Sequence, residues 1–158
     1  MLRIISKMKT YLTIATAALL SFSASQQISA HCQVPCGIYT DDTVLKDLQT
    51  HQQTIAKAMA QIDELSKDAG KNANQISRWV SNKESHAALI QTTMLDYFLA
   101  QRLKPAEMES NKEAYLKKLT LSHQIIVLAM KCKQTTDLEN SKQLKAALDA
   151  FTTAYNKK

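Results

Sequence analysis

Glycine and proline are nearly absent from this sequence, which holds two of each among 158 residues. Both residues interrupt helices, and both are common in the turns that join short strands. Apolar residues make up 45 % of the chain, and its length suffices for one domain with a real core. The sequence therefore predicts an all-α domain built from long helices.

The first two predicted helices are separated by a short polar link. The first begins with the acids Asp41 and Asp42, which suit a helix N-terminus, and ends near Gly70. After the link at residues 71–74, the second helix runs until Pro105 stops it. Its inward positions follow a heptad pattern: Ile76, Val80, Lys83, Ala87, Ile90, Met94 and Tyr97. The lysine fits this pattern because its long stem lets the ammonium reach water.

Two further helices complete the expected architecture. Ser110 and Glu113 have the spacing of a capping box at the start of the third helix. Thr135 or Thr136 begins the fourth. The inward positions are Leu116, Leu119, Ile126 and Met130 in the third helix, and Leu138, Leu144, Leu148, Phe151 and Tyr155 in the fourth. Four helices joined by short loops predict an up-down-up-down four-helix bundle over residues 40–158.

The first thirty residues have the three parts of a secretory signal peptide. Three basic residues by position 9 precede an apolar stretch at residues 11–22, and small Ala30 follows. We expect a processing peptidase to cut after Ala30, so that His31 starts an exported protein, periplasmic or secreted, with no stable membrane anchor. The alternatives are an uncleaved anchor, transit to an organelle lumen, or a cytoplasmic protein processed in another way.

The charge of the chain argues against nucleic-acid binding. The net charge is +6, but three of the twenty basic residues lie in the first thirty residues, which contain no acid. The remaining seventeen basic and fourteen acidic residues are interspersed and form no basic run. The sequence also lacks a glycine-rich phosphate loop, a nucleophile elbow and the Glu-x-x-His pairs of di-iron bundles.

Three reactive side chains of the helical part have ordinary interpretations. His51 and His123 lie beside polar neighbours, and we expect both at the surface. Cys132 stands between two lysines with no second cysteine nearby, which predicts a free, inert thiol rather than a metal ligand.

Residues 31–39 read HCQVPCGIY and concentrate the chemistry of the sequence. Two thiols in a C-x3-C spacing can reach one metal ion, with Pro35 stiffening the turn and Gly37 tolerating a positive φ after it. After cleavage, His31 adds a free amine to its imidazole. Nitrogen and sulfur donors of this kind suit nickel or copper better than zinc. A Cys32–Cys36 disulfide in an oxidising compartment is the alternative that the spacing leaves open.

HCQVPCGIY resembles the nickel-binding hook of the nickel superoxide dismutase family and matches all fixed positions of that hook. RWVSNKESHA at residues 78–87 and the DYF at residues 96–98 resemble later segments of the same family. The resemblance implies that residues 31–39, the hook, bind one nickel ion per subunit ahead of a four-helix bundle. It also implies a homohexamer that converts superoxide to dioxygen and hydrogen peroxide while nickel cycles between two and three positive charges. His31 would give its amine and axial imidazole, Cys32 its thiolate and amide nitrogen, and Cys36 the second thiolate.

The resemblance assigns supporting roles to five further residues. Tyr39 would control approach at the mouth of the hook, and Tyr97 is the candidate for a second tyrosine near the site. Pro35 would hold the turn of the hook. Asp47 falls where the family has the carboxylate that braces the axial imidazole, and His86 where it has an arginine with the same duty.

Two other functions use the same residues. An exported, non-catalytic metal-binding protein would bind the metal and leave superoxide untouched. A thiol-disulfide protein would cycle the two cysteines, but C-x3-C differs from the C-x-x-C of thioredoxin-like enzymes and no βαβ pattern accompanies it.

Overall fold

The computed structural model describes residues 40–157, and every regular element within that range is helical. The four long helical segments are α2 (Asp41–Leu65), α3 (Ala69–Thr92) with its continuation η2 (Thr93–Arg102), α5 (Lys112–Gln134) and α6 (Leu138–Asn156). Two short elements connect them: η1 (Ser66–Asp68) and α4 (Glu107–Ser110).

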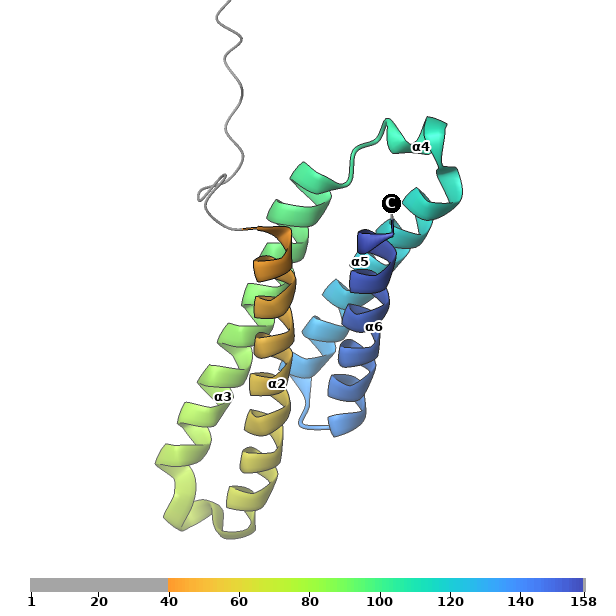
Figure 1. Ribbon diagram of the computed structural model, residues 1–158. Helices are drawn as coiled ribbons and strands as arrows, with labels where there is room; N and C mark the ends of the chain where they lie inside the picture. The colour runs from red at the N-terminus through yellow and green to blue at the C-terminus, as the bar shows by residue number, and fades with distance from the viewer. Residues whose placement is uncertain (1–39, 158) are drawn as a thin grey trace, which may run out of the picture. The chain divides into compact units, whose positions relative to one another are not determined.

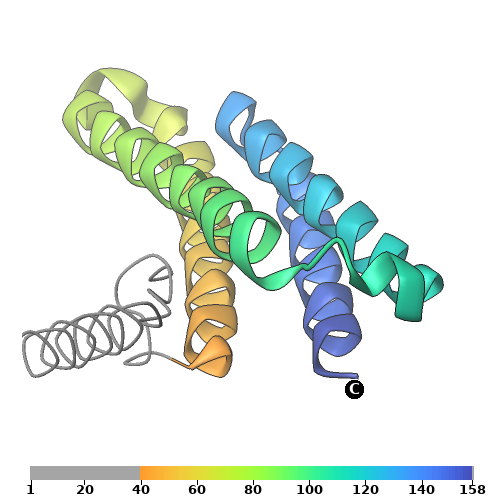
Figure 2. The ribbon, with the colours of Figure 1, turned by 90° about the horizontal axis from the view of Figure 1, so that it is seen from above.

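Successive long helices run in opposite directions along the bundle (Figure 1). Helix α2 packs against α3 and α6, and α5 packs against the same two neighbours, which closes a ring of four (Figure 2). This arrangement confirms the predicted up-down-up-down four-helix bundle. The start of α2 and the ends of η2 and α6 lie at one end of the bundle (Figure 1).

The core lies along the bundle axis and contains side chains from all four segments. Its largest fully buried members are Leu48, Ile55, Met59, Ile90, Met94, Phe98, Ile125, Cys132, Leu144, Leu148 and Phe151. Each large apolar side chain removed from water contributes about 1.5–3 kcal/mol, so this core is the main reason that the helices stay together. No helix of the described residues is long and apolar enough to cross a membrane.

The junction between the first two helices differs from the sequence prediction. The break comes at η1, and Gly70 with the predicted link 71–74 belongs to α3. Asp68 caps α3 by accepting a hydrogen bond from the Lys71 amide at 3.4 Å, and Asn72 donates to the Leu65 carbonyl at 3.1 Å. Polar side chains thus satisfy both helix ends, and the chain needs only three residues to reverse. The stop at Pro105 is confirmed, because the preceding helix ends at Arg102.

The predicted caps of the last two long helices are wrong by one or two residues. Asn111 caps α5 by accepting from the Ala114 amide at 3.1 Å, while Ser110 ends α4. Asp137 caps α6 by accepting from the Glu139 amide at 3.0 Å. Asn and Asp cap helices as well as Ser or Thr does, so residue type alone could not show which of two adjacent residues is the N-cap.

The predicted inward face of the third helix is wrong at three of its four residues, and only Ile126 packs against the core, half-buried. Leu116, Leu119 and Met130 are exposed, at 38 %, 37 % and 41 %. The buried face of α5 instead carries Ser122, Ile125, Leu128, Ala129 and Cys132. Apolar residues occur on both faces of α5. The face that packs against α3 and α6, and is therefore buried, is the one with the smaller side chains. In α3 and α6, Val80 and Leu138 are likewise exposed, although both were expected inside.

Lys83 lies in the core and does not reach water. It is 3 % exposed, and its ammonium donates to the carbonyl oxygens of Cys132 at 2.7 Å and Lys133 at 2.5 Å. A third contact joins it to the Glu84 carboxylate at 3.2 Å. The carbonyls at the end of a helix have no partner within the helix, so Lys83 closes the C-terminus of α5 from a neighbouring helix.

Candidate functional site

The proposed metal ligands and half of the six residues predicted to support them lie outside the described residues. These are His31, Cys32 and Cys36, together with Pro35, Gly37 and Tyr39. Their roles therefore stay predictions. The described chain begins at Thr40, the residue that follows the hook, and the structure shows the end of the bundle to which the hook is joined.

Asp41 is the first residue of α2, and the side chains of Tyr97, Arg102 and Tyr155 surround its carboxylate. We call these four residues the Asp41 cluster. The hydroxyl of Tyr97 and the Nε of Arg102 (3.0 Å) donate to Oδ1 of Asp41. The hydroxyl of Tyr155 donates to Oδ2 at 2.7 Å. Arg102 also donates to the Tyr97 hydroxyl oxygen at 2.9 Å, and its guanidinium carbon lies 4.4 Å from the centre of the Tyr97 ring. The cluster therefore joins α2, η2 and α6.

The cluster has a settled distribution of protons near neutral pH. Burial raises the pKa of Asp41, but hydrogen bonds from Tyr97, Tyr155 and Arg102 outweigh it and hold that pKa below its ordinary value of 3.8. Burial and the hydrogen bond to the carboxylate raise the pKa of both tyrosines. Asp41 is thus a carboxylate and both phenols keep their protons, which are directed at its two oxygens.

The local helix geometry brings Arg102 over Tyr97. The two residues are five apart in η2, a π-helical segment in which the Leu103 amide donates to the Phe98 carbonyl, five residues back, at 2.9 Å. In a regular α-helix, residues five apart point in different directions, whereas the wider π-turn stacks them. Phe98 supports both tyrosines, with ring centres 5.1 Å from Tyr97 and 5.2 Å from Tyr155 and edge-on geometry.

The sequence predicted only one member of the Asp41 cluster as a site residue. Tyr97 was expected near the site, whereas Asp41 was read as a first-turn acid and Tyr155 as core. The partners of Asp41 are 56, 61 and 114 residues away in the chain. No local pattern signals contacts at such separations, so only the packed bundle reveals them.

A second group of polar side chains lies between α2 and α3. The Nδ1 atoms of His51 and His86 are 2.9 Å apart, and their ring centres are 5.0 Å apart. At that distance one Nδ1 carries a proton and the other accepts it. Burial and the charge of His86 lower the pKa of His51, and the charge of Asp47 opposes this.

The structure therefore corrects the prediction for His51, which is half-buried and paired instead of free at the surface. Asp47 is exposed and stands one helical turn before His51. Its charge acts on His51, which in turn contacts His86, so a histidine to which the sequence assigned no role lies between two predicted residues. The four-residue spacing from Asp47 to His51, which places both on one face of α2, was the available signal. His123 is exposed, as predicted.

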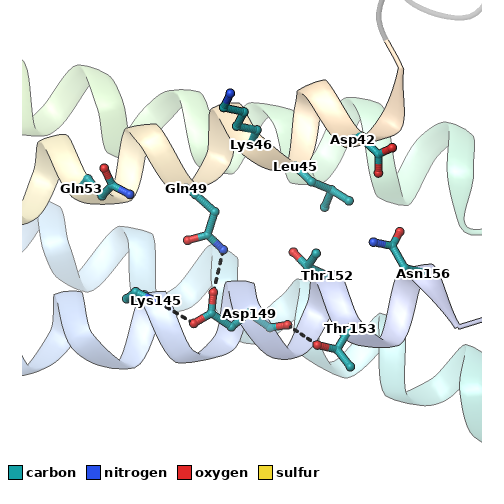
Figure 3. Close-up of a pocket in the computed structure, with 10 residues that line it drawn as sticks. All are labelled: Asp42, Leu45, Lys46, Gln49, Gln53, Lys145, Asp149, Thr152, Thr153 and Asn156. Carbon is teal, nitrogen blue, oxygen red and sulfur yellow. Dashed lines mark hydrogen bonds and ion pairs between the residues drawn. The ribbon is translucent and has the colours of Figure 1, made fainter.

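An open groove of about 590 Å³ lies between α2 and α6 (Figure 3). Gln49 reaches across it from α2 and donates to Asp149 on α6 at 3.0 Å, and Lys145 pairs with the same carboxylate at 2.7 Å (Figure 3). These three side chains thus bind one another, and none of the predicted site residues lines the groove.

The described residues contain no group of three or more His, Cys, Asp or Glu side chains that could hold a metal. Cys132 is a free cysteine, as predicted, and the structure shows that it is buried. Burial raises the pKa of its thiol to about 11, although the charge of Lys83 opposes this. At neutral pH it is a protonated, apolar side chain. The other two thiols of the sequence are those of Cys32 and Cys36.

Residues 26–158 match the family model of nickel-containing superoxide dismutase. The chain belongs to this family. The match includes the hook sequence and all of the described helices, and it confirms the resemblance inferred from HCQVPCGIY. No curated protein and no solved structure matches the chain.

The donors in the chain fit the metal that gives this family its name. The hook sequence offers two thiols and an imidazole, and cleavage before His31 would add an amine. The described part of the bundle offers no competing group of ligands.

Proposed function

We propose that the mature chain is an enzyme that converts two superoxide anions and two protons to dioxygen and hydrogen peroxide, with one nickel ion per subunit. The observation that carries this proposal is the family match, which spans the hook sequence as well as the bundle. His31 would bind the metal through its amine and imidazole, Cys32 through its thiolate and amide nitrogen, and Cys36 through its thiolate. Bound nickel would supply the one-electron chemistry by alternating between two and three positive charges.

The amine of His31 as a ligand links the proposed export of the protein to its proposed activity. While Ala30 precedes His31, the nitrogen of His31 is an amide with no basic lone pair. A processing peptidase that cuts after Ala30 therefore creates the site as it removes the signal peptide, and the enzyme works as an exported protein, periplasmic or secreted. The three-part signal sequence in residues 1–30 supports this proposal.

Two tyrosines have different proposed duties. Tyr39 would control the approach of superoxide and order water or an anion near the open side of the metal. Tyr97 would line the site without releasing its proton, since its hydroxyl donates to Asp41 and accepts from Arg102. Loss of that proton would leave a phenolate beside a carboxylate. The protons that the reaction consumes would then come from water or another group.

His86 and Asp47 would support the imidazole of His31. What favours His86 is its half-buried place against His51, which restrains the ring, and its position in the family-like segment 78–87. Asp47 is one turn from His51 on α2 and keeps its carboxylate exposed. His31 is ten positions before Asp41, a length of chain that can cover up to about 33 Å, whereas Asp41 and His51 are about 15 Å apart along α2.

The proposed assembly is a homohexamer. Several large apolar side chains of the described bundle are exposed, and covering them in an oligomer would remove this surface from water. They include Leu89, Leu95, Leu116, Leu119 and Met130.

The decisive experiment uses protein that begins at His31. We expect one nickel per chain by elemental analysis, superoxide removal by stopped-flow spectrophotometry, and a native mass that reports bound metal and subunit number together. Cys32→Ser and Cys36→Ser should lose both nickel and activity, whereas the matched control Cys132→Ala should keep both. Activity without bound nickel would refute the proposal. Nickel binding without activity would instead support the non-catalytic metal-binding protein.

A further inference from the structure

Asp41 is the first residue of α2 and stands two residues after Tyr39, the last residue of the hook. Its carboxylate accepts hydrogen bonds from Tyr97 and Arg102 on one oxygen and from Tyr155 on the other. Asp42 is its neighbour in the same turn, but the Asp42 side chain is exposed and receives no hydrogen bond or ion pair from the described residues. Two adjacent acids at one helix end thus have different surroundings.

We propose that Asp41 is a positioning residue, whose carboxylate ties the first turn of α2 to η2 and α6 and so sets the place from which the hook leaves the bundle. This inference rests on the proposed function, because it assigns the hook a metal to hold. It adds Asp41, Arg102 and Tyr155 to the residues on which nickel binding depends, although none of them would touch the metal.

The contacts around Asp41 restrain both the rotation and the withdrawal of its side chain. Donors from two different elements hold its two oxygens, so that the side chain can neither rotate nor withdraw without breaking one of them. The donors are themselves held: Arg102 bonds to the Tyr97 hydroxyl, and the edge of Phe98 supports both tyrosine rings. Helix ends fray when nothing secures them. This end is secured by a side chain as well as by the Thr40 cap.

The cluster favours a carboxylate over its amide. The hydroxyls of Tyr97 and Tyr155 and the Nε of Arg102 all donate to Asp41, so both of its oxygens act as acceptors. Asparagine has one oxygen and one NH₂ group: if the NH₂ group faces Arg102, two donors meet, and if it faces Tyr155, that hydroxyl must turn and accept instead of donate. In either case Arg102 loses the negative charge with which it pairs at 3.0 Å, so Asp41→Asn weakens the attachment while it keeps the size of the side chain.

The test compares Asp41→Asn with Asp42→Asn in metal-free protein that begins at His31. Both variants remove one negative charge from the first turn of α2, so the effect on the helix dipole and on the general field is matched. Nickel affinity is measured by titration with nickel alone, followed through the thiolate-to-nickel absorption. We expect Asp41→Asn to weaken nickel binding about tenfold or more, the range known for groups that orient metal ligands. Asp42→Asn should stay within about twofold of the wild type.

Two further variants distinguish the loss of the Asp41 hydrogen bonds from a general folding defect. Tyr155→Phe removes one hydrogen bond and keeps the ring, so it should weaken nickel binding in the same direction but less. Asp41→Glu keeps the charge and both acceptors and should recover part of the lost affinity. Hydrogen exchange at the amides of Thr43 and Val44 should quicken in Asp41→Asn and not in Asp42→Asn, with or without metal.

The inference is overturned if Asp41→Asn lowers the melting temperature but keeps the nickel affinity and absorption spectrum of the wild type, since Asp41 is then purely structural. Equal losses in Asp41→Asn and Asp42→Asn also overturn it, because charge alone would explain them. Failure of the wild type to bind nickel refutes the proposed function instead, and the hydrogen exchange still reports whether Asp41 secures the helix end.

Discussion

The hydroxyl of Tyr155 allows a stability prediction that depends on one hydrogen bond. Tyr155→Phe removes the donor that lies 2.7 Å from Oδ2 of Asp41, and the ring remains stacked on Phe151 and edge-on to Phe98. The substitution therefore leaves no cavity. It deprives a charged acceptor of one partner, while Tyr97 and Arg102 still donate to the other oxygen.

The expected cost follows from the exposure of the acceptor. A hydrogen bond to a charged group contributes about 1.5–3 kcal/mol when water cannot replace it. The Asp41 side chain is 38 % exposed, so water takes up part of the loss, and we expect Tyr155→Phe to lower the free energy of unfolding by about 1–2 kcal/mol. For a domain of this size, that corresponds to a fall in melting temperature of about 3–10 °C.

The effect should also depend on pH with a definite sign. The pKa of Asp41 in the folded protein is below its ordinary value of 3.8, so its hydrogen bonds stabilise the fold above that pH. As the pH falls through the folded pKa, the carboxylate gains a proton and this stabilisation is lost. The difference between wild type and Tyr155→Phe should therefore be full at pH 7 and shrink below about pH 4.

Urea unfolding at one protein concentration, with pH varied, measures this difference. Tyr115→Phe is the matched control, because Tyr115 is also half-buried against the core and its hydroxyl makes no hydrogen bond within the described residues. We expect the control to change stability by less than about 0.5 kcal/mol. If Tyr155→Phe and Tyr115→Phe behave alike, or if Tyr155→Phe costs as much at pH 3 as at pH 7, the account of the Asp41 cluster is wrong.

Three further outcomes test other parts of the protein. Because burial lowers the pKa of His51 below 6.5, stability should fall as the pH drops below about 6.5; His51→Gln should reduce this dependence in thermal unfolding, and exposed His123→Gln should keep it. Lys83→Met should lower the free energy of urea unfolding by about 1–3 kcal/mol, since two carbonyls at the end of α5 lose their donor, with exposed Lys131→Met unchanged. One extra residue before His31 should abolish superoxide removal and leave the helical circular dichroism intact.

Each of these outcomes can contradict its premise. A pH dependence that survives in His51→Gln would remove the histidine pair as its source. An unchanged Lys83→Met protein would mean that relief of the buried charge offsets the lost hydrogen bonds. An active enzyme with an N-terminal extension would show that the amine of His31 is not a ligand.

The sequence by itself determined the fold class and the types of donor atom that the hook can offer. Long stretches without glycine or proline, with apolar residues every three or four positions, have few alternatives to helices, and Pro105 marks a stop that any fold must respect. The donor types of His31, Cys32 and Cys36 are likewise properties of the residues themselves. Such features are local, and a local pattern can be read without knowing what lies across the bundle.

Only the tertiary structure decided how each helix is rotated about its axis. In α5, Leu116 and Leu119 are as apolar as Ile125 and Leu128, so the sequence did not show which pair is buried. Packing against α3 and α6 buries Ile125 and Leu128. The rotation of the helices then brought distant polar side chains into contact. It set His51 against His86 across two helices, and it gathered three distant donors around Asp41. These contacts arise from the packing of whole helix faces, and no stretch of a few residues contains that information.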